Sequence, residues 1–230
     1  MKPPVSFAYA ALFLVAHTAS AATVTLSGSS VDFTYDDALV SLFGTPTVLG
    51  DTIYFTPADF DVISENGAGI SFTNALVNIS VAPKAGFDLD SVSLFERGSY
   101  LLLGAGMKWV EASGQVSAFD LADPGVFSTA SLVSTPTTTA GLPPNYWDAM
   151  AGINLDTSAW QAGGGINLTI ENFLIASTAA PGSMAFMDKG YIGASFVASP
   201  VPEPEDYLLM LASIGLIGFV VVHRSSGGGH

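Results

Sequence analysis

Residues 69–81 read Gly-Ile-Ser-Phe-Thr-Asn-Ala-Leu-Val-Asn-Ile-Ser-Val, a long run in which apolar and polar side chains alternate. Successive side chains of a strand point to opposite faces of a sheet, so this run predicts a β-strand. Ile70 and Phe72 share one face, and the alternation then changes phase near Asn74-Ala75. A change of phase inside a strand predicts a bulge or a bend at that point.

Shorter segments of the same kind lie on both sides of this run and are separated by glycine, proline and serine. Two pairs of segments are predicted to be neighbouring strands that are joined by tight turns. The pairs are residues 91–103 with 107–119, joined at Gly104-Ala105-Gly106, and residues 165–176 with 183–198, joined across Ala180-Pro181-Gly182.

No segment of residues 22–200 keeps the 3.6-residue apolar period of a helix. Residues 145–150, after Pro143-Pro144, are predicted to form one helical turn. Many short strands with regular turn signals are typical of β-sandwiches. We therefore predict an all-β fold, a single jelly-roll-like β-sandwich domain over residues 22–200.

The placing of histidine and the absence of cysteine exclude several kinds of catalytic site. The chain has no cysteine, and its histidines, His17, His223 and His230, all lie outside residues 22–200. A Ser-His-Asp triad, a thiolate nucleophile and a histidine-ligated metal are therefore excluded from the domain. Paired carboxylates or a Ser/Lys pair are the chemistries that remain, and no pair stands out. The domain is not expected to be an enzyme.

The charge balance limits the partners. The formal net charge is −14 at pH 7. An exterior this acidic repels phosphate backbones, so no nucleic-acid partner is expected. It could attract divalent cations.

The N-terminus predicts export. Lys2 precedes an apolar stretch over residues 5–16, and small residues follow at Ala19 and Ala21. A positive residue, a short apolar core and small residues at −3 and −1 describe a secretory signal peptide. Residues 1–21 are the predicted signal peptide, and cleavage is expected before Ala22.

The C-terminus combines three features over residues 201–226. Val201 is followed by Pro202-Glu203-Pro204, residues 207–222 carry no charge, and Arg224 follows them. The uncharged run is predicted to be a transmembrane helix, short for a hydrocarbon core about 30 Å thick. The acidic and basic flanks place the C-terminus in the cytoplasm.

This tail resembles the PEP-CTERM sorting signal, in which Pro202-Glu203-Pro204 would be the named tripeptide. It departs from the family's usual cluster of arginines, because Arg224 stands alone. The resemblance implies an exosortase-type membrane protease or transpeptidase as partner. It also implies a transient stay in the inner membrane, followed by the cell surface or the extracellular matrix.

Asn145-Tyr146-Trp147-Asp148 is the candidate sugar-binding segment. Flat aromatic rings stack on sugar faces, while Asn145 and Asp148 could hydrogen-bond to hydroxyl groups. The alternative is that the rings pack in the core of the sandwich, and we favour it for Trp147.

Two pairs of aspartates, Asp59 with Asp61 and Asp88 with Asp90, are candidates for a calcium site. A spacing of two puts both carboxylates on one side of an extended segment, where Ca²⁺ could collect oxygen ligands. The alternative is that they are solvated turn residues, and no other cofactor is expected.

Three functions follow from these observations. The leading hypothesis is an exported cell-surface or matrix protein with a structural or adhesive role among exopolysaccharides, sorted by an exosortase-type system. The second is a carbohydrate-binding module. The third is a glycoside hydrolase that uses carboxylates.

Overall fold

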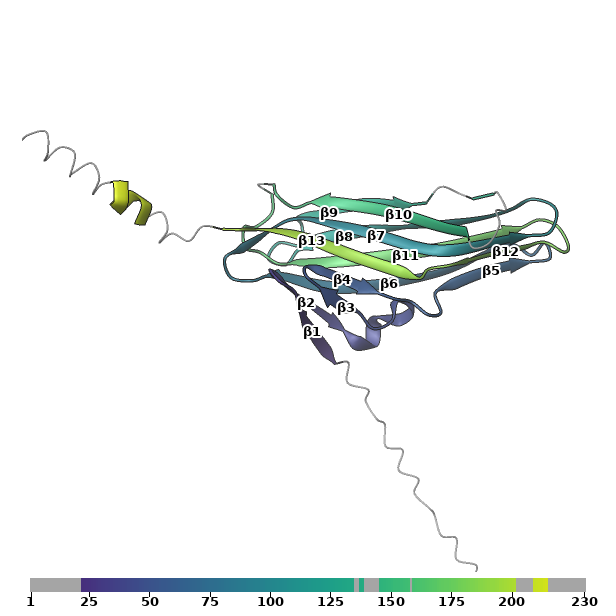
Figure 1. Cartoon of the computed structure of the whole chain (residues 1–230), viewed down its shortest axis with the longest axis horizontal. Coiled ribbons are helices and arrows are strands. Elements are labelled where there is room, and N and C mark those ends of the chain that lie inside the picture. The colour runs from purple at the N-terminus through teal and green to yellow at the C-terminus, as the bar shows by residue number, and fades with distance from the viewer. Residues whose placement is uncertain (1–21, 135–136, 139–144, 158, 202–208, 215–230) are drawn as a thin grey trace, which may run out of the picture.

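The computed structural model describes residues 22–134, 137–138, 145–157, 159–201 and 209–214. The described chain is mostly β-strand and forms two antiparallel sheets, as the prediction of an all-β sandwich requires (Figure 1). Sheet A has the strand order β1-β2-β6-β11-β8-β9. Sheet B has the order β3-β4-β13-β7-β12-β5, and β10 pairs with β7. The elements are β1 (Thr23–Ser27), β2 (Val31–Asp36), the 3₁₀ helices η1 (Asp37–Leu39) and η2 (Ser41–Phe43), β3 (Thr47–Leu49), β4 (Thr52–Phe55), β5 (Asp61–Glu65), β6 (Gly69–Pro83), β7 (Phe87–Leu103), β8 (Lys108–Asp120), β9 (Phe127–Val133), β10 (Asn145–Asn154), β11 (Ile166–Thr178), β12 (Met184–Asp188) and β13 (Tyr191–Pro200).

The strand predicted over residues 69–81 is present as β6, and of the bulge or bend predicted near Asn74-Ala75 the bulge is wrong. β6 pairs with β11 in one unbroken antiparallel register from Gly69 to Val81. Ile70 and Phe72 point to solvent, and the buried face begins at Ala75. Ile70 and Phe72 keep the same phase as the outward residues Leu76 and Asn78, so the alternation does not change phase there.

The two predicted hairpins are also wrong, because both turns carry the chain from one sheet to the other. β7 belongs to sheet B and β8 to sheet A, while β11 belongs to sheet A and β12 to sheet B. The two crossings touch, since Ala179 N donates to Met107 O at 3.0 Å. A Cβ on Gly104 would lie 2.1 Å from Gly182 O, so this contact requires glycine. A glycine turn shows that the chain reverses, but not which sheet receives the next strand.

Two further segments differ from their predictions. Residues 145–150 form the start of β10 and not a helical turn, because they pair with β7 along the edge of sheet B. Residues 183–198 form two strands, β12 and β13, separated at Lys189-Gly190. Both strands pair with β7, β13 along residues 87–97 and β12 along residues 100–103. On its other edge β13 pairs with β4, and β12 pairs with β5.

The core lies between the sheets and is filled by aliphatic and phenylalanine side chains from both. Phe43, Phe55 and Phe60 form an edge-to-face cluster with ring centroids 5.4 and 5.9 Å apart. Phe33 of sheet A lies 5.6 Å from Phe196 of sheet B. The contact between Phe33 and Phe196 joins the two sheets through apolar burial in a chain that has no cysteine.

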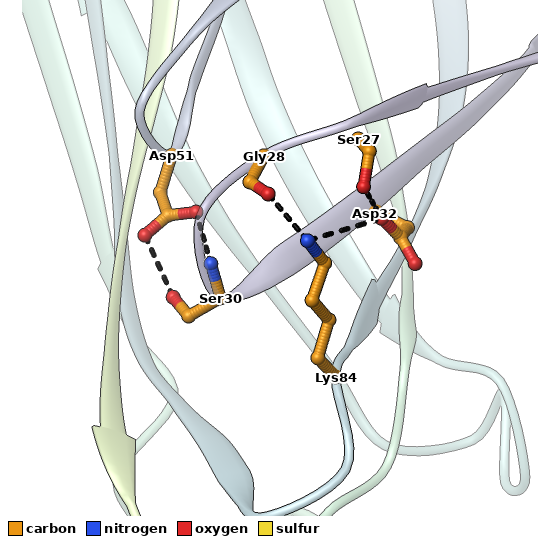
Figure 2. Close-up of polar contacts among 6 residues, drawn as sticks. All are labelled: Ser27, Gly28, Ser30, Asp32, Asp51 and Lys84. Carbon is orange, nitrogen blue, oxygen red and sulfur yellow. Dashed lines mark hydrogen bonds and ion pairs between the residues drawn. The ribbon is translucent and has the colours of Figure 1, made fainter.

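A polar cluster joins the β1–β2 turn to the β3–β4 turn (Figure 2). Asp51 accepts hydrogen bonds from Ser30 N at 2.7 Å and from Ser30 Oγ at 2.6 Å. Desolvation raises the pKa of Asp51, but these hydrogen bonds outweigh it and hold the pKa below its usual value. Lys84 Nζ donates to Gly28 O and lies 3.8 Å from Asp32 Oδ1. The cluster therefore ties sheet A to sheet B at this end.

The predicted terminal signals lie almost wholly outside the described residues. Residues 1–21, including Ala19 and Ala21, are outside them, as are Pro202, Glu203, Pro204 and Arg224. Residues 209–214 are helical. Within the described ranges, no helix is long and apolar enough to cross a membrane.

Candidate functional site

The alternation of β10 separates the four residues of the predicted sugar-binding segment. Trp147 points inward and is buried, and its Nε1 donates to Asp188 O at 2.9 Å. Tyr146 and Asp148 point to solvent, and Tyr146 is 66% exposed. Asn145 Nδ2 donates to Tyr100 O at 3.5 Å. Trp147 is therefore a core residue, and the two adjacent aromatic rings do not form a joint platform.

A different set of aromatic side chains lies together on the outer face of sheet B. Tyr54 of β4, Tyr191 of β13 and Phe95 of β7 are half-buried residues from three neighbouring strands. The Tyr54 and Tyr191 ring centroids are 6.0 Å apart with an interplanar angle of 20°, and the Phe95 and Tyr191 centroids are 6.1 Å apart. We call these three residues the aromatic row.

Gly193 explains how the Tyr191 ring reaches this position. Gly193 lies between Tyr54 and Phe95 in the register of the sheet. A Cβ on Gly193 would lie 2.5 Å from the Tyr191 hydroxyl oxygen and 2.9 Å from its ring. The Tyr191 side chain therefore lies over the glycine backbone, between its two aromatic neighbours.

Two surface cavities lie beside the aromatic row and share Tyr191. The first has a volume of about 360 Å³ and is lined by Leu49, Thr52, Tyr54, Tyr191 and Ser195. The second has a volume of about 270 Å³ and is lined by Arg97, Gly98, Ser99, Tyr146, Asp188, Gly190 and Tyr191. Because both are lined by Tyr191, the ring stands between two hollows on one sheet face.

Polar groups around the second cavity are held in place by the sheet. Asp188 accepts hydrogen bonds from Ser99 N at 2.7 Å and from Ser99 Oγ at 2.9 Å. The Arg97 guanidinium carbon lies 5.3 Å from the centre of the Phe95 ring. A hydroxyl-bearing ligand on the aromatic row would thus find an ordered carboxylate and a guanidinium at its edge.

The sequence did not single out the aromatic row, because its members are distant along the chain. Of the predicted sugar-binding residues, Tyr146 lines the second cavity, so one residue of that prediction joins the site. The alternation of residues 191–195 indicates a strand with Tyr191 outward, but it does not say which side chains lie beside it. That depends on the pairing of β13 with β4 and β7.

A third cavity, at the end of the sandwich, contains three carboxylates. It has a volume of about 270 Å³ and is lined by Asp88, Leu89, Asp120, Leu155, Asp156, Thr157, Trp160, Gln161, Ala162, Gly164 and Ile166. Asp120 is 3% exposed and accepts from Gln161 N at 3.1 Å, Ala122 N at 2.7 Å and Asp123 N at 3.1 Å. These hydrogen bonds, the one from Gln161 above all, hold the pKa of Asp120 below its usual value. Asp120 therefore anchors the loop that carries Trp160. Because its pKa is lowered, the Asp120 carboxyl is unsuited to donate a proton as the acid of a glycosidase.

The carboxylates of the predicted calcium-binding pair Asp88 and Asp90 have different hydrogen-bond partners. Asp88 Oδ1 accepts from Gly163 N at 3.0 Å, whereas Asp90 Oδ1 accepts from Ser199 Oγ at 2.9 Å. Asp59 and Asp61 are both exposed, near the start of β5. The described part of the chain contains no group of three or more histidine, cysteine, aspartate or glutamate side chains that could hold a metal ion.

The two described residues of the predicted processing sites lie at the ends of the domain. Ala22 O accepts from Asp37 N at 3.1 Å, directly before β1. Val201 N donates to Gly86 O at 2.8 Å, directly after β13. Ala22 and Val201 thus both hydrogen-bond to residues of the sandwich.

No protein-family model matches the chain, and no curated protein matches it. Two solved structures of viral particles show a distant likeness. The T13 particle of IBDV is 13% identical, with a TM-score of 0.22, over 81% of this chain and 57% of that chain. The infectious bursal disease virus Gt strain is 12% identical, with a TM-score of 0.21, over 81% of this chain and 60% of that chain. The chain thus spans less than two thirds of the length of either, and likeness at these scores carries no argument about function.

Proposed function

We propose that this chain is an exported cell-surface or matrix protein that adheres to exopolysaccharide through the aromatic row of sheet B. The observation that supports this proposal is the set of Tyr54, Tyr191 and Phe95 rings on a solvent-facing sheet, between two cavities. Rings in the core contribute to stability, but rings on an outer face remain available to a ligand.

The chemistry of the face favours sugar over other ligands. Aromatic rings present flat apolar surfaces to the C–H faces of a sugar ring, and the surrounding hydroxyl, carboxylate and guanidinium groups can bind its hydroxyl groups. Ser99, Asp188 and Arg97 supply those groups at the second cavity. With a net charge of −14, the protein would repel a polyanion, so the expected polysaccharide is neutral.

The placement outside the cell rests on the two termini. The predicted signal peptide brings the chain to the export machinery. The resemblance of residues 201–226 to the PEP-CTERM signal implies an exosortase-type partner and release from the inner membrane. An adhesive domain between two such signals would be delivered to the layer in which exopolysaccharide accumulates.

Affinity electrophoresis through gels that contain neutral polysaccharides tests the proposal. Tyr191→Ala and Tyr54→Ala should each weaken the retention about tenfold, the equivalent of about 1.4 kcal/mol for a buried aromatic contact. Phe72→Ala is the matched control, because Phe72 is an exposed ring on the outer face of sheet A, on the opposite side of the molecule. It should leave the retention unchanged.

Two outcomes would count against this function. Retention that is unaffected by either tyrosine substitution would remove the aromatic row from the binding surface. Equal loss of retention in the Phe72→Ala variant would show that the sheet faces bind without selectivity. The melting temperature of each variant is measured alongside, so that unfolding is not mistaken for lost binding.

A further inference from the structure

Glu96, Asn172 and Lys189 are three of the ten polar or charged side chains that are buried among the described residues. Glu96 of β7 and Asn172 of β11 are 0% exposed, and Lys189, after β12, is 1% exposed. Glu96 Oε1 and both Asn172 side-chain atoms, Oδ1 and Nδ2, have no hydrogen-bond partner among the described residues. Buried polar atoms without partners are costly, so a core that retains three of them needs an explanation.

Lys189 is positioned as a nucleophile rather than as a solvated cation. Its Nζ contacts Glu96 Oε2, and it lies 5.1 Å from the Phe60 ring centre and 5.6 Å from that of Trp147. Burial among these rings lowers the pKa of Lys189, although Glu96 opposes the shift. A desolvated lysine amine next to a carboxylate that can take its proton is the arrangement that makes lysine reactive.

The crossing from β11 to β12 places Asn172 and Lys189 at similar heights in the sandwich. Asn172 lies six positions before Thr178, the end of β11, and Lys189 lies five positions after Met184, the start of β12. Strands rise about 3.3 Å per residue, so nearly equal steps from one crossing end at nearly equal heights. β11 and β12 pack against each other across the two sheets.

The crossing from β7 to β8 independently places Glu96 at the level of Asn172. Glu96 lies seven positions before Leu103, the end of β7, and Gly114 lies six positions after Lys108, the start of β8. Gly114 pairs directly with Asn172 in sheet A. Glu96 and Asn172 are thus brought to one level from opposite sheets, and Gly114 adds no side chain beside the Asn172 carboxamide.

We propose that Lys189 and Asn172 are joined by an intramolecular amide bond, with Glu96 as the group that transfers protons. Glu96 takes a proton from the Lys189 ammonium, and the neutral Nζ attacks Cγ of Asn172. The Nζ–Cγ bond forms and the Cγ–Nδ2 bond breaks. Of the two protons that leave Nζ, one passes through Glu96 to Nδ2, which departs as ammonia, and the other remains on Glu96. An amine and a carboxamide become a secondary amide and ammonia, without oxidant or reductant.

The bond would tie sheet A to sheet B in an exported chain that has no cysteine for a disulfide. It joins the middle of β11 to the point where β12 ends and β13 begins. It also removes the unpaired carboxamide and the buried cation, the two groups that are most costly to leave in this core.

Peptide mass spectrometry of the denatured full-length protein after trypsin digestion tests the proposal. Trypsin does not cleave after an acylated lysine, and Asn172 and Lys189 both follow the cleavage site at Lys108. The linked protein should therefore yield one peptide that starts at Trp109 and continues past Lys189. Its mass should be about 17 Da below the sequence value, the mass of the ammonia lost when the lysine amine acts as nucleophile.

Variants separate the roles of the three residues. Glu96→Gln removes the proton carrier and Asn172→Ala removes the acceptor, so both should restore cleavage after Lys189 with no mass loss. Lys84→Arg changes a lysine that is partly exposed and forms an ion pair with Asp32, and it is the matched control that should keep the link.

The digest has distinct results that would overturn the proposal. Normal cleavage after Lys189 in the protein without substitutions would show that Lys189 forms only its ion pair with Glu96 and carries no amide bond. A loss of about 18 Da, with the peptide over residues 85–97 attached, would show condensation with Glu96 instead. A link that persists in Glu96→Gln would remove Glu96 from the reaction. None of these readouts depends on polysaccharide binding, so the amide bond and the adhesive function stand or fall separately.

Discussion

Replacing Trp147 and Tyr146 separately by alanine gives the sharpest test of the structure, because the two residues are adjacent in the chain and opposite in burial. Trp147 is 5% exposed, and truncation of a buried tryptophan costs about 3 to 5 kcal/mol. Asp188 O would also lose its donor, Trp147 Nε1. We therefore expect Trp147→Ala to lower the free energy of unfolding by about 4 to 5 kcal/mol. Tyr146 is 66% exposed, so Tyr146→Ala should change the free energy of unfolding by less than about 0.5 kcal/mol.

The measurement is urea unfolding followed by far-ultraviolet circular dichroism. Trp147→Phe keeps most of the ring volume but removes the donor, and it should cost about 1 to 2 kcal/mol, so a loss remains measurable if the alanine variant does not fold. A cost below about 1 kcal/mol for Trp147→Ala, or a larger loss of stability in Tyr146→Ala, would contradict the burial of Trp147. Either result would mean that β10 presents its other face to the core.

Four further outcomes follow from the structure. The folded pKa of Asp120 lies below its unfolded value, so its contribution to stability is present above about pH 4 and is lost as the pH falls through the folded value. Asp120→Asn should therefore lower the melting temperature at pH 7 and flatten its decline in acid. Gly98→Ala should destabilise by about 3 kcal/mol or more in the same urea assay, because its Cβ would lie 1.9 Å from Asp188 O, whereas Gly152→Ala, with no atom nearer than 3.6 Å, should cost less than about 1 kcal/mol. Since the two aspartates of residues 88–90 accept hydrogen bonds from different partners, the melting temperature should be equal in millimolar calcium and in chelator. Replacing Pro202-Glu203-Pro204 by alanines should leave the protein in the inner-membrane fraction, and normal appearance in the medium would contradict the sorting proposal.

Local patterns in the sequence were sufficient for the class of the fold. Alternation over residues 69–81 predicts β6, and turn residues at regular spacing predict a sandwich. Alternation over residues 145–148 also separates Trp147 from Tyr146, because these residues lie in β10. The helical turn predicted after the diproline is wrong there. Alternation succeeds because it records which side of a strand is apolar, and that is a property of the strand alone.

The partners of each strand were decided only by the tertiary structure. The turns at Gly104-Ala105-Gly106 and Ala180-Pro181-Gly182 suggested hairpins, yet both cross between the sheets. The choice between a hairpin and a crossing depends on how the buried faces of distant strands pack, and no local signal carries that information.

Both candidate sites depend on which strands pair and where the chain crosses between the sheets. Tyr54, Phe95 and Tyr191 become neighbours through the pairing of β4, β13 and β7. Glu96 and Lys189 meet in the core because β7 and β13 are adjacent, and Asn172 reaches their level through the crossing from β11 to β12. The sequence by itself determined which residues face inward or outward along most strands, because the period of a strand is local. Only the tertiary structure decided which of those residues meet, because contacts between distant strands depend on the packing of the whole domain.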